Sequence, residues 1–448
     1  MTDLPPGWIV APLGELVDVL DSQRVPVSAK ERAERSGSVP YYGAAGQVGF
    51  IDAAIFDEDL VLLGEDGVQF FDLYKGKAYR IYGPAWVNNH AHVLRPRGML
   101  EISYLHHYLN SFDYRGYANG TTRLKLTQAA MNRIPVRLPP VREQCRIVAD
   151  LGVHLSRLDK AADLLAKQLL RLRALKKRVL VDAVPLGDET GWRTVTVAEA
   201  GRVDLGRQRH PDWHTGEHMR PYLRVANVFE DRIDTADVME MDFPPAIFEK
   251  FKLVPGDILL NEGQSPEFLG RPALYRGVPR DVAFTNSLLR FRAGPDVDPE
   301  WALLVFRRHM HAGRFAREVR ITTNIAHLSA TRFKAVEFPI PPLAEQREIV
   351  ARTADRLAGV DRLIAEVEHA ARKADALRAS LLAEAFAGRL VPQDPNDEPA
   401  AELLARIRAE RSATIPKQRT RSRRTPRELA APPTRVTGDD YQQETLPL

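Results

Sequence analysis

The sequence contains one long pattern written twice. Residues 138–149 read LPPVREQCRIVA and residues 340–351 read IPPLAEQREIVA, with identical residues recurring at a constant offset of 202. The offset continues without a gap through the residues that follow. Such self-similarity constrains the fold strongly, because both copies must adopt the same local structure. We therefore expect a compact domain followed by a long helix, repeated once.

The segment after each Pro-Pro pair is predicted to be a long helix. Its apolar residues step by four and three, which places them along one face of a helix. Each helix spans roughly 40 residues, or about 60 Å. Pro-Pro suits a helix start, and Pro185 with Gly187, or Gly388 with Pro392, suits an end. The predicted seam residues are Leu151, Leu155, Leu158, Ala162, Leu165, Leu169, Leu172, Leu175 and Val179, and their counterparts are Thr353, Leu357, Val360, Ile364, Val367, Ala371, Ala374, Leu377 and Leu381.

Two arrangements would bury such seams. The helices could be core helices of a large bundle, or they could pack on each other or on a partner. The sustained heptad spacing favours the second arrangement, and two such helices in one chain would pair most simply in antiparallel fashion, as a rigid spacer.

The globular parts before the helices, here called the heads, correspond more loosely. Gly7-Trp8 matches Gly191-Trp192 at offset 184, and 61–65 resembles 258–262 at offset 197. The second head thus carries 13 extra residues early (197 − 184) and 5 more late (202 − 197). Short apolar runs bounded by Gly, Pro and acidic residues predict strands, and 101–111 and 299–310 predict short helices. Each head is expected to be α/β or α+β, and heads that vary on a constant scaffold suggest that they recognise different things.

Bulk properties narrow the class of protein. A chain of 448 residues exceeds one ordinary core, and a net charge of +4 conceals 63 Lys and Arg. Cys145 is the single cysteine, which excludes an internal disulfide and a cysteine-rich metal site. The start MTDLPPGW has no secretory signal and no run is long enough to span a membrane, so a cytoplasmic location is expected.

Several catalytic signatures are missing. Gly76-Lys77 lacks the remainder of a phosphate-binding loop. Residues 242–246 (DFPPA) differ from the [DN]PP[YF] motif of amino-methyltransferases by an intruding residue and a missing aromatic. His210, His214 and His218 are spaced by four, as in a zinc site on a helix, but the nearby Pro and Gly favour a loop with solvated or DNA-facing histidines.

Basic and polar residues in both heads are candidates for contacts to DNA, because Arg, Lys, Gln, Asn and Thr recognise base edges and phosphates. Ordinary solvated charge is the alternative for each of them. A Thr-Thr-polar loop recurs at equivalent places, which raises that loop above the rest. The candidates are Lys75, Lys77, Arg80, Thr121, Thr122, Arg123 and Lys125 in the first head, and Arg207, Gln208, Arg209, Gln264, Arg271, Arg320, Thr322, Thr323 and Asn324 in the second.

Residues 417–427 (KQRTRSRRTPR) are basic and carry no acid. This composition is typical of a disordered segment, which either attracts phosphates nonspecifically or serves as a solubilising tail.

Together these features resemble the specificity subunit of type I restriction–modification enzymes. VPYYGAAGQVGFID (39–52), LVLLGEDGVQF (60–70) and WVNNHAHVLRP (86–96) look like a target recognition domain of that family, and the two PPxxEQxxIV starts look like its conserved helical regions. LLAEAFAGRLVPQDPNDEPAAELL (381–404) looks like its usual ending. The resemblance covers about 1–410, and the second head follows the family pattern less closely.

The resemblance implies an α/β (α+β) fold with two target recognition domains in pseudo-twofold arrangement, separated by two long antiparallel coiled-coil helices. The expected domains are a first recognition domain (1–140), a central helix (141–184), a second recognition domain (185–342), a C-terminal helix (343–390) and a largely disordered tail (391–448). It also implies that the chain binds no cofactor and no metal. Two modification subunits would bind S-adenosylmethionine and methylate adenine, and restriction or motor subunits would use ATP and Mg.

Three hypotheses follow. The first is a non-catalytic adaptor that binds a bipartite double-stranded DNA target and docks modification subunits. The second is an enzyme that acts on DNA alone through an unrecognised site. The third is a protein-binding coiled-coil scaffold without sequence-specific DNA recognition. The first accounts for the repeat, the variable heads and the missing catalytic motifs.

Overall fold

The computed structural model describes residues 4–187, 190–317 and 326–414. The chain forms two compact units, Met1–Val148 with Phe386–Leu448, and Ala149–Ala385. Each unit contains one head, and the second also contains most of the two long helices. Among the described residues, no helix has an apolar stretch long enough to cross a membrane.

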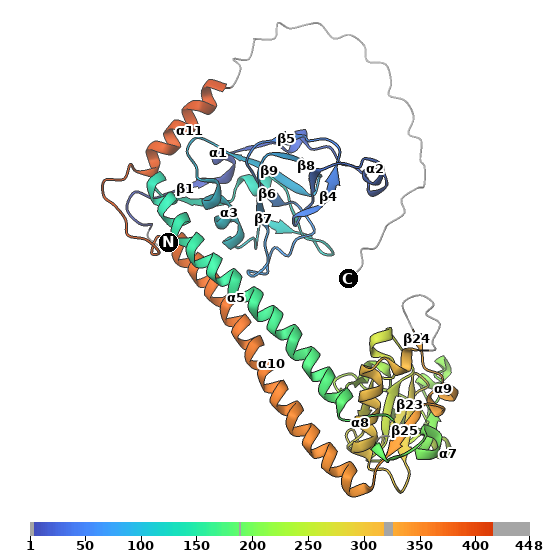
Figure 1. Ribbon diagram of the computed structural model, residues 1–448. Helices are drawn as coiled ribbons and strands as arrows, with labels where there is room; N and C mark the ends of the chain where they lie inside the picture. Colours follow the sequence, from blue (N-terminus) through green and yellow to red (C-terminus); the bar gives the residue numbers. More distant parts are fainter. Residues whose placement is uncertain (1–3, 188–189, 318–325, 415–448) are drawn as a thin grey trace, which may run out of the picture. The chain divides into compact units, whose positions relative to one another are not determined.

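The two long helices are α5 (Val141–Asp182) and α10 (Leu343–Phe386). Within the second unit they run antiparallel, side by side (Figure 1), as predicted. Lys176 of α5 lies 2.6 Å from Asp361 of α10, and Arg378 of α10 pairs with Asp159 of α5. The offset of 202 converts one pair into the other (176 + 202 = 378 and 159 + 202 = 361). The helix pair is therefore locally pseudo-twofold in its ion pairs.

The seam between the helices follows most of the predicted positions, including buried Leu155, Leu172 and Leu357. Three predicted seam positions are wrong. Leu175 and Leu377 are 44% and 56% exposed, and Ala162 is exposed. The half-buried residues there are Ala161, Lys176 and Arg378. An α-helix has 3.6 residues per turn, so a strict 3.5-residue pattern drifts around it and the contact moves to the adjacent position.

The first head is built on two four-stranded sheets. One is antiparallel in the order β2-β9-β6-β7, and the other has the order β4-β3-β8-β5 with a parallel β3–β8 pair. A separate pair joins β1 to β12. The strands are β1 (Ile9–Pro12), β2 (Val17–Val19), β3 (Val39–Tyr42), β4 (Gln47–Ile51), β5 (Phe56–Asp57), β6 (Leu60–Gly64), β7 (Ala78–Ile81), β8 (Pro84–Val87), β9 (Ala91–Pro96), β10 (Ala118–Asn119), β11 (Lys125–Leu126) and β12 (Pro135–Leu138). The helices are α1 (Leu13–Leu16), α2 (Ala29–Glu34), α3 (Ile102–Ser111) and α4 (Gln128–Asn132).

The second head repeats this topology. Its antiparallel sheet has the order β14-β23-β19-β21, its second sheet has the order β18-β15-β22 with a parallel β15–β22 pair, and β13 joins β25. The strands are β13 (Arg193–Thr196), β14 (Gly201–Leu205), β15 (Met219–Leu223), β16 (Val228–Phe229), β17 (Arg232–Ile233), β18 (Met239–Asp242), β19 (Ile258–Asn261), β20 (Gly263–Gln264), β21 (Pro272–Leu274), β22 (Ala283–Phe284), β23 (Leu288–Ala293), β24 (Ala326–His327) and β25 (Glu337–Ile340). The helices are α6 (Val197–Ala200), α7 (Pro245–Phe251), α8 (Pro299–His311) and α9 (Ala330–Lys334).

The central strands of both heads come from the predicted apolar runs. All of β6 and β19 are buried, because helices α3 and α8 cover one face and further apolar residues cover the other. The helices predicted at 101–111 and 299–310 are confirmed as α3 and α8. Each begins at an acidic cap, Glu101 or Asp298, whose carboxylate accepts a backbone N–H of the first turn.

The repeated Glu-Gln dipeptide ties each head to its long helix. Gln144 accepts the Glu101 N–H at 2.9 Å and donates to the Pro139 carbonyl at 3.0 Å. Gln346 accepts the Asp298 N–H at 2.8 Å and donates to the Pro341 carbonyl at 2.7 Å. The neighbouring glutamates accept an indole N–H: Trp8 donates to Glu143 at 3.0 Å, and Trp192 donates to Glu345 at 3.1 Å. We call these bonds the helix-start contacts.

The prediction that 391–448 is largely disordered is wrong for its described part. A further helix of the first unit, α11 (Ala400–Thr414), packs against α1 and β1. Leu403 and Ile407 are buried there, and Arg408 pairs with Glu15. The Pro-rich composition concealed a helix whose apolar residues gain burial only on the head. The basic residues 417–427 lie outside the described residues.

Candidate nucleic-acid interface

A charged edge forms in the first head where β6 ends. Glu65 and Asp66 follow β6, and β11 lies against them: the Leu126 N–H donates to the Glu65 carbonyl at 2.8 Å, and Asp66 bridges to Lys125. This pairing brings two predicted DNA contacts, Arg123 and Lys125, beside two acids that the sequence analysis did not single out.

Two basic side chains at this edge each form an ion pair with one of the two acids. Lys125 lies 3.0 Å from Glu65, and Arg123 lies 2.9 Å from Asp66. The acids are nearly buried, with side chains 13% and 16% exposed, whereas Arg123 and Lys125 are 59% and 53% exposed. Burial alone would raise the pKa of Glu65, but hydrogen bonds from Arg24 and Lys125 outweigh it and lower that pKa. Buried carboxylates therefore hold exposed cations in place at the surface.

Two glycines permit this geometry. Gly120, at the turn before β11, has φ +148°, and a Cβ there would lie 2.1 Å from the Arg123 carbonyl oxygen. Gly67, with φ +71°, lies under the Arg123 guanidinium, and a Cβ would come within 2.7 Å of its Nη2. A side chain at either position would displace the arginine. Thr121 and Thr122 are exposed on the same turn.

The second head has an acid–base contact at the equivalent edge. The Leu328 N–H donates to the Glu262 carbonyl at 2.7 Å, and His327 Nδ1 lies 3.1 Å from the Glu262 carboxylate. Glu262 corresponds to Glu65 at offset 197, and His327 corresponds to Lys125 at offset 202 (65 + 197 = 262 and 125 + 202 = 327). The two heads therefore present the same construction with different bases.

Known proteins resemble this chain in sequence and in fold. The model of the type I restriction modification DNA specificity domain matches residues 5–172. The specificity subunit of the type I restriction enzyme EcoKI from Escherichia coli K12 is 25% identical over 74% of this chain and 76% of its own length. The EcoDI specificity subunit of Escherichia coli is 24% identical over 94% of this chain and 99% of its own. Over most of its length the chain therefore resembles type I restriction–modification specificity subunits.

The fold of this chain is also found in a solved structure. A chain described under complex assembly and conformational transition of the type I R-M system superposes with a TM-score of 0.66, at 18% identity. It covers 87% of this chain and all of its own. This likeness shows that the two chains share a fold.

Three potential metal ligands, Asp21, Glu65 and His92, gather at the charged edge of the first head, with ligand atoms within 4.8 Å of one another. His92 is buried, and its Nδ1 lies 2.6 Å from Asp21 while its Nε2 donates to the Leu126 carbonyl at 2.8 Å. Both ring nitrogens are thus already engaged by protein groups. Arg24, 2.8 Å from Glu65, supplies positive charge instead. We interpret the group as an ion-pair network that supports the edge.

The other predicted contacts of the first head lie apart from this edge. Lys77 is a correction: it is buried, and its ammonium donates to the Asp72 carbonyl at 2.5 Å, so it presents no charge to DNA. Burial lowers its pKa. Arg80, on β7, is half-buried, donates to Ser103 and lies over the Tyr82 ring. Lys75 is exposed.

The predicted contacts of the second head form two groups. Arg207 is half-buried over the rings of Trp213 and Phe243, at 3.9 and 4.7 Å, while Gln208 and Arg209 are exposed. Gln264, on β20, pairs with Ala326 of β24 and so lies at the charged edge. Arg271 packs over the rings of Phe229 and Phe268. The residues Arg320, Thr322, Thr323 and Asn324 lie outside the described residues.

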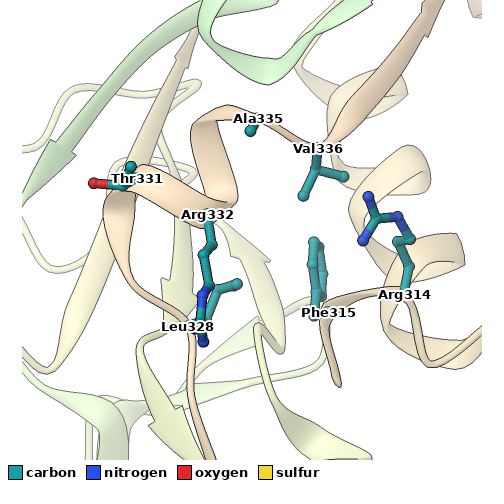
Figure 2. A pocket seen from close by; sticks show the side chains of 7 residues that line it. All are labelled: Arg314, Phe315, Leu328, Thr331, Arg332, Ala335 and Val336. Carbon is teal, nitrogen blue, oxygen red and sulfur yellow. The ribbon is translucent and has the colours of Figure 1, made fainter. Parts of the chain in front are cut away.

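A small pocket borders the described ends of that segment. It has a volume of about 250 Å³, and its lining includes Arg314, Phe315 and Arg332. Figure 2 shows the two arginines on either side of the Phe315 ring. Arg314 is held 2.9 Å from Glu337, while Arg332 is exposed. Arg332 therefore adds an exposed cation near the edge that carries Gln264.

Sequence reasoning missed the acids of this interface. Glu65 and Glu262 recur at the end of matched strands, but acidic side chains are not among the residue types expected to contact DNA. Asp66 and His327 carry no pattern of their own, because only the pairing of two distant segments brings them to the edge.

Proposed function

We propose that this chain binds a bipartite double-stranded DNA target, with each head recognising one half-site through its charged edge. The observation that supports this most is the recurrence of an acid-supported base, Lys125 on Glu65 and His327 on Glu262, in heads that otherwise differ. Basic side chains that are held by partly buried carboxylates are preorganised for hydrogen bonds to the edges of DNA bases, which require defined donor positions. The exposed cations would also contact phosphates.

The basic residues at the two edges differ, which supports recognition of a different half-site by each head. Arg123 and Lys125 supply charged donors at the first edge, whereas His327 and Gln264 stand at the second. Arginine suits guanine, and glutamine suits adenine. We expect the first half-site to depend on at least one guanine contact.

The long helices would set the distance between the half-sites and dock two modification subunits. Their ion pairs are related by the repeat, so the pair offers two similar surfaces to two equal partners. Val153, Leu164 and Leu175 of α5 are 51%, 67% and 44% exposed at a spacing of eleven residues, which puts them on one face. Such a stripe is a docking surface for an apolar partner helix.

The chain would act as a non-catalytic subunit. Its modification subunits would bind S-adenosylmethionine and methylate adenine, and restriction subunits would use ATP and Mg for cleavage. The carboxylates of the charged edge are engaged by arginine and lysine.

The decisive experiment is coexpression with the neighbouring modification subunit, followed by mapping of methylated adenines on genomic DNA. A single bipartite motif is the expected result, and Arg123→Ala should alter one half of it only. Methylation without such a motif would refute the proposal. Purified chain alone should neither methylate nor cut DNA. A protein-binding scaffold, the alternative, predicts an assembled complex that shows no sequence preference for DNA.

A further inference from the structure

The start of the first head is covered by the chain's own C-terminal segment. Gly388 lies so close to Trp8 that a Cβ there would come within 3.2 Å of the indole. Further along, the Ala400 N–H donates to the Gly7 carbonyl at 2.9 Å. Under this cover Trp8 is 6% exposed and Pro140 is buried.

The second head has the same starting residues without such a cover in the part of the chain that the structure describes. Its counterparts of Trp8 and Pro140 are Trp192, which is half-buried, and Pro342, which is exposed. They line an open groove of about 480 Å³ together with Gly191, Arg193, Asp296, Ile340, Pro341 and Leu343. Leu343 is 38% exposed. We call this the Trp192 groove.

The segment between α5 and the second head is too short to supply an equivalent cover. Residues 387–414 follow α10 and form the cover of the first head. Only residues 183–190 separate α5 from Gly191, and they lead directly into the second head. The helix-start contacts are nevertheless the same in both heads. The Trp192 groove is therefore built from the same backbone and indole positions that contact residues 387–414 in the first unit.

Charge distinguishes the two surfaces. In the first unit, Arg146 lies 2.6 Å from Asp397 of the cover, and Arg142 and Arg146 contribute to the lowered pKa of Asp394 after its backbone hydrogen bond to Asn396. At offset 202 these arginines become Ala344 and Glu348. Glu348 is exposed, and its ion partner among the described residues is Arg352, 3.8 Å away on its own helix.

The missing arginines exclude a second copy's C-terminal segment as the occupant, because its Asp397 would face Glu348. A segment that packs on Trp192 in the same way, but carries a basic side chain at the position of Asp397, would form an ion pair with Glu348 instead.

We propose that the Trp192 groove binds a polypeptide segment of a partner subunit, one that places a glycine turn against Trp192 and a lysine or arginine against Glu348. This rests on the proposed function, since the segment comes from a subunit of that assembly. The bound segment would do for the second head what residues 387–414 do for the first, sealing the junction between head and helix.

The test uses the full chain assembled with its modification subunit. A photo-crosslinking amino acid replaces Leu343, and mass spectrometry identifies the crosslinked peptide. We expect a basic, glycine-containing segment of the partner. Crosslinks to residues 415–448 of this chain, or to a second copy, would overturn the proposal.

Two variants make the test quantitative. Trp192→Ala should weaken assembly about tenfold, the loss typical of an anchoring aromatic residue. Glu348→Lys should weaken it as well, without touching the core. Glu240→Lys is the matched control, because Glu240 is exposed on β18 and carries the same charge change.

The outcomes separate the two proposals. A complex that assembles and methylates its motif, yet yields no crosslink at Leu343 and no difference between Glu348→Lys and Glu240→Lys, overturns the groove and leaves the proposed function intact. A chain that never assembles with the modification subunit overturns both.

Discussion

The helix-start contacts allow a quantitative prediction for Gln346→Ala. The Gln346 amide is completely buried; it accepts the Asp298 N–H and donates to the Asp296 and Pro341 carbonyls, at 2.7–2.8 Å. At about 1 kcal/mol of net stability per bond, the loss is about 3 kcal/mol. The matched Gln144→Ala removes the bonds to Glu101 and Pro139 from the first head, so its cost is about 2 kcal/mol.

Amide hydrogen exchange followed by mass spectrometry is the suitable assay, because it reports each head separately. A loss of 3 kcal/mol corresponds to roughly a hundredfold faster exchange for amides that exchange by opening of this junction. We expect this acceleration in peptides covering 296–311 for Gln346→Ala, and a smaller one in 99–111 for Gln144→Ala. Gln168→Ala, at an exposed site on α5, is the control.

Unchanged exchange at 296–311 would refute the reasoning, since it would mean that the buried amide does not hold α8 to the long helix. Equal acceleration in both heads from either variant would also contradict it, because the two sets of contacts lie in separate units.

Three further predictions address the seam, the response to pH and the DNA edge. Leu172→Glu, at a site 6% exposed, should lower the urea midpoint of the second unit because it buries a charge in the seam, whereas Leu175→Glu should leave that midpoint unchanged and weaken docking of the modification subunit. Burial lowers the pKa of His309 from 6.5 to about 4, so between these pH values the unfolded chain binds a proton that the folded chain does not. The stability that neutral His309 contributes is complete above pH 6.5 and is lost as the pH falls to 4. The variant His309→Gln should therefore reduce the change in urea midpoint across this pH range. Arg123→Ala should cost about 1–3 kcal/mol on DNA that carries the motif if it contacts a base, with little change on other DNA, whereas Lys77→Ala should leave the salt dependence of binding unaltered; an equal loss of affinity on every sequence would make Arg123 a phosphate contact.

The long helices could be predicted from the sequence because their signal is local and repeated. Pro-Pro starts, heptad spacing and glycine ends bounded α5 and α10 to within a few residues. The errors at Leu175 and Leu377 arose because a heptad spacing predicts the buried face only approximately over about eleven turns of helix. Which side chain lies in the seam there depends on the partner helix, as the Lys176–Asp361 pair shows.

The heads were predictable in class and not in detail. Strands β6 and β19 followed from fully apolar runs, but the pairing order of their sheets depends on contacts between residues far apart in sequence. The same limit applied to the charged edge. Arg123 and Lys125 were identified by residue type, Lys77 was misassigned because its burial depends on Asp72 and Asn110, and Asp66 was missed.

The helix-start contacts also bear on how such a protein can change over generations. Each glutamine bonds to main-chain atoms, the Glu101 amide and Pro139 carbonyl in one copy and the Asp298 amide and Pro341 carbonyl in the other. Main-chain atoms are present in every sequence, so a recombination event that replaced most of the chain between Trp8 and Pro139 would preserve the helix-start contacts if it kept one indole and the backbone path, and the packing of α11 if it also kept the surface of β1 and α1. The junction therefore permits exchange of a whole head as a cassette, and a new DNA preference could be acquired in one genetic step without a compensating change in the helices.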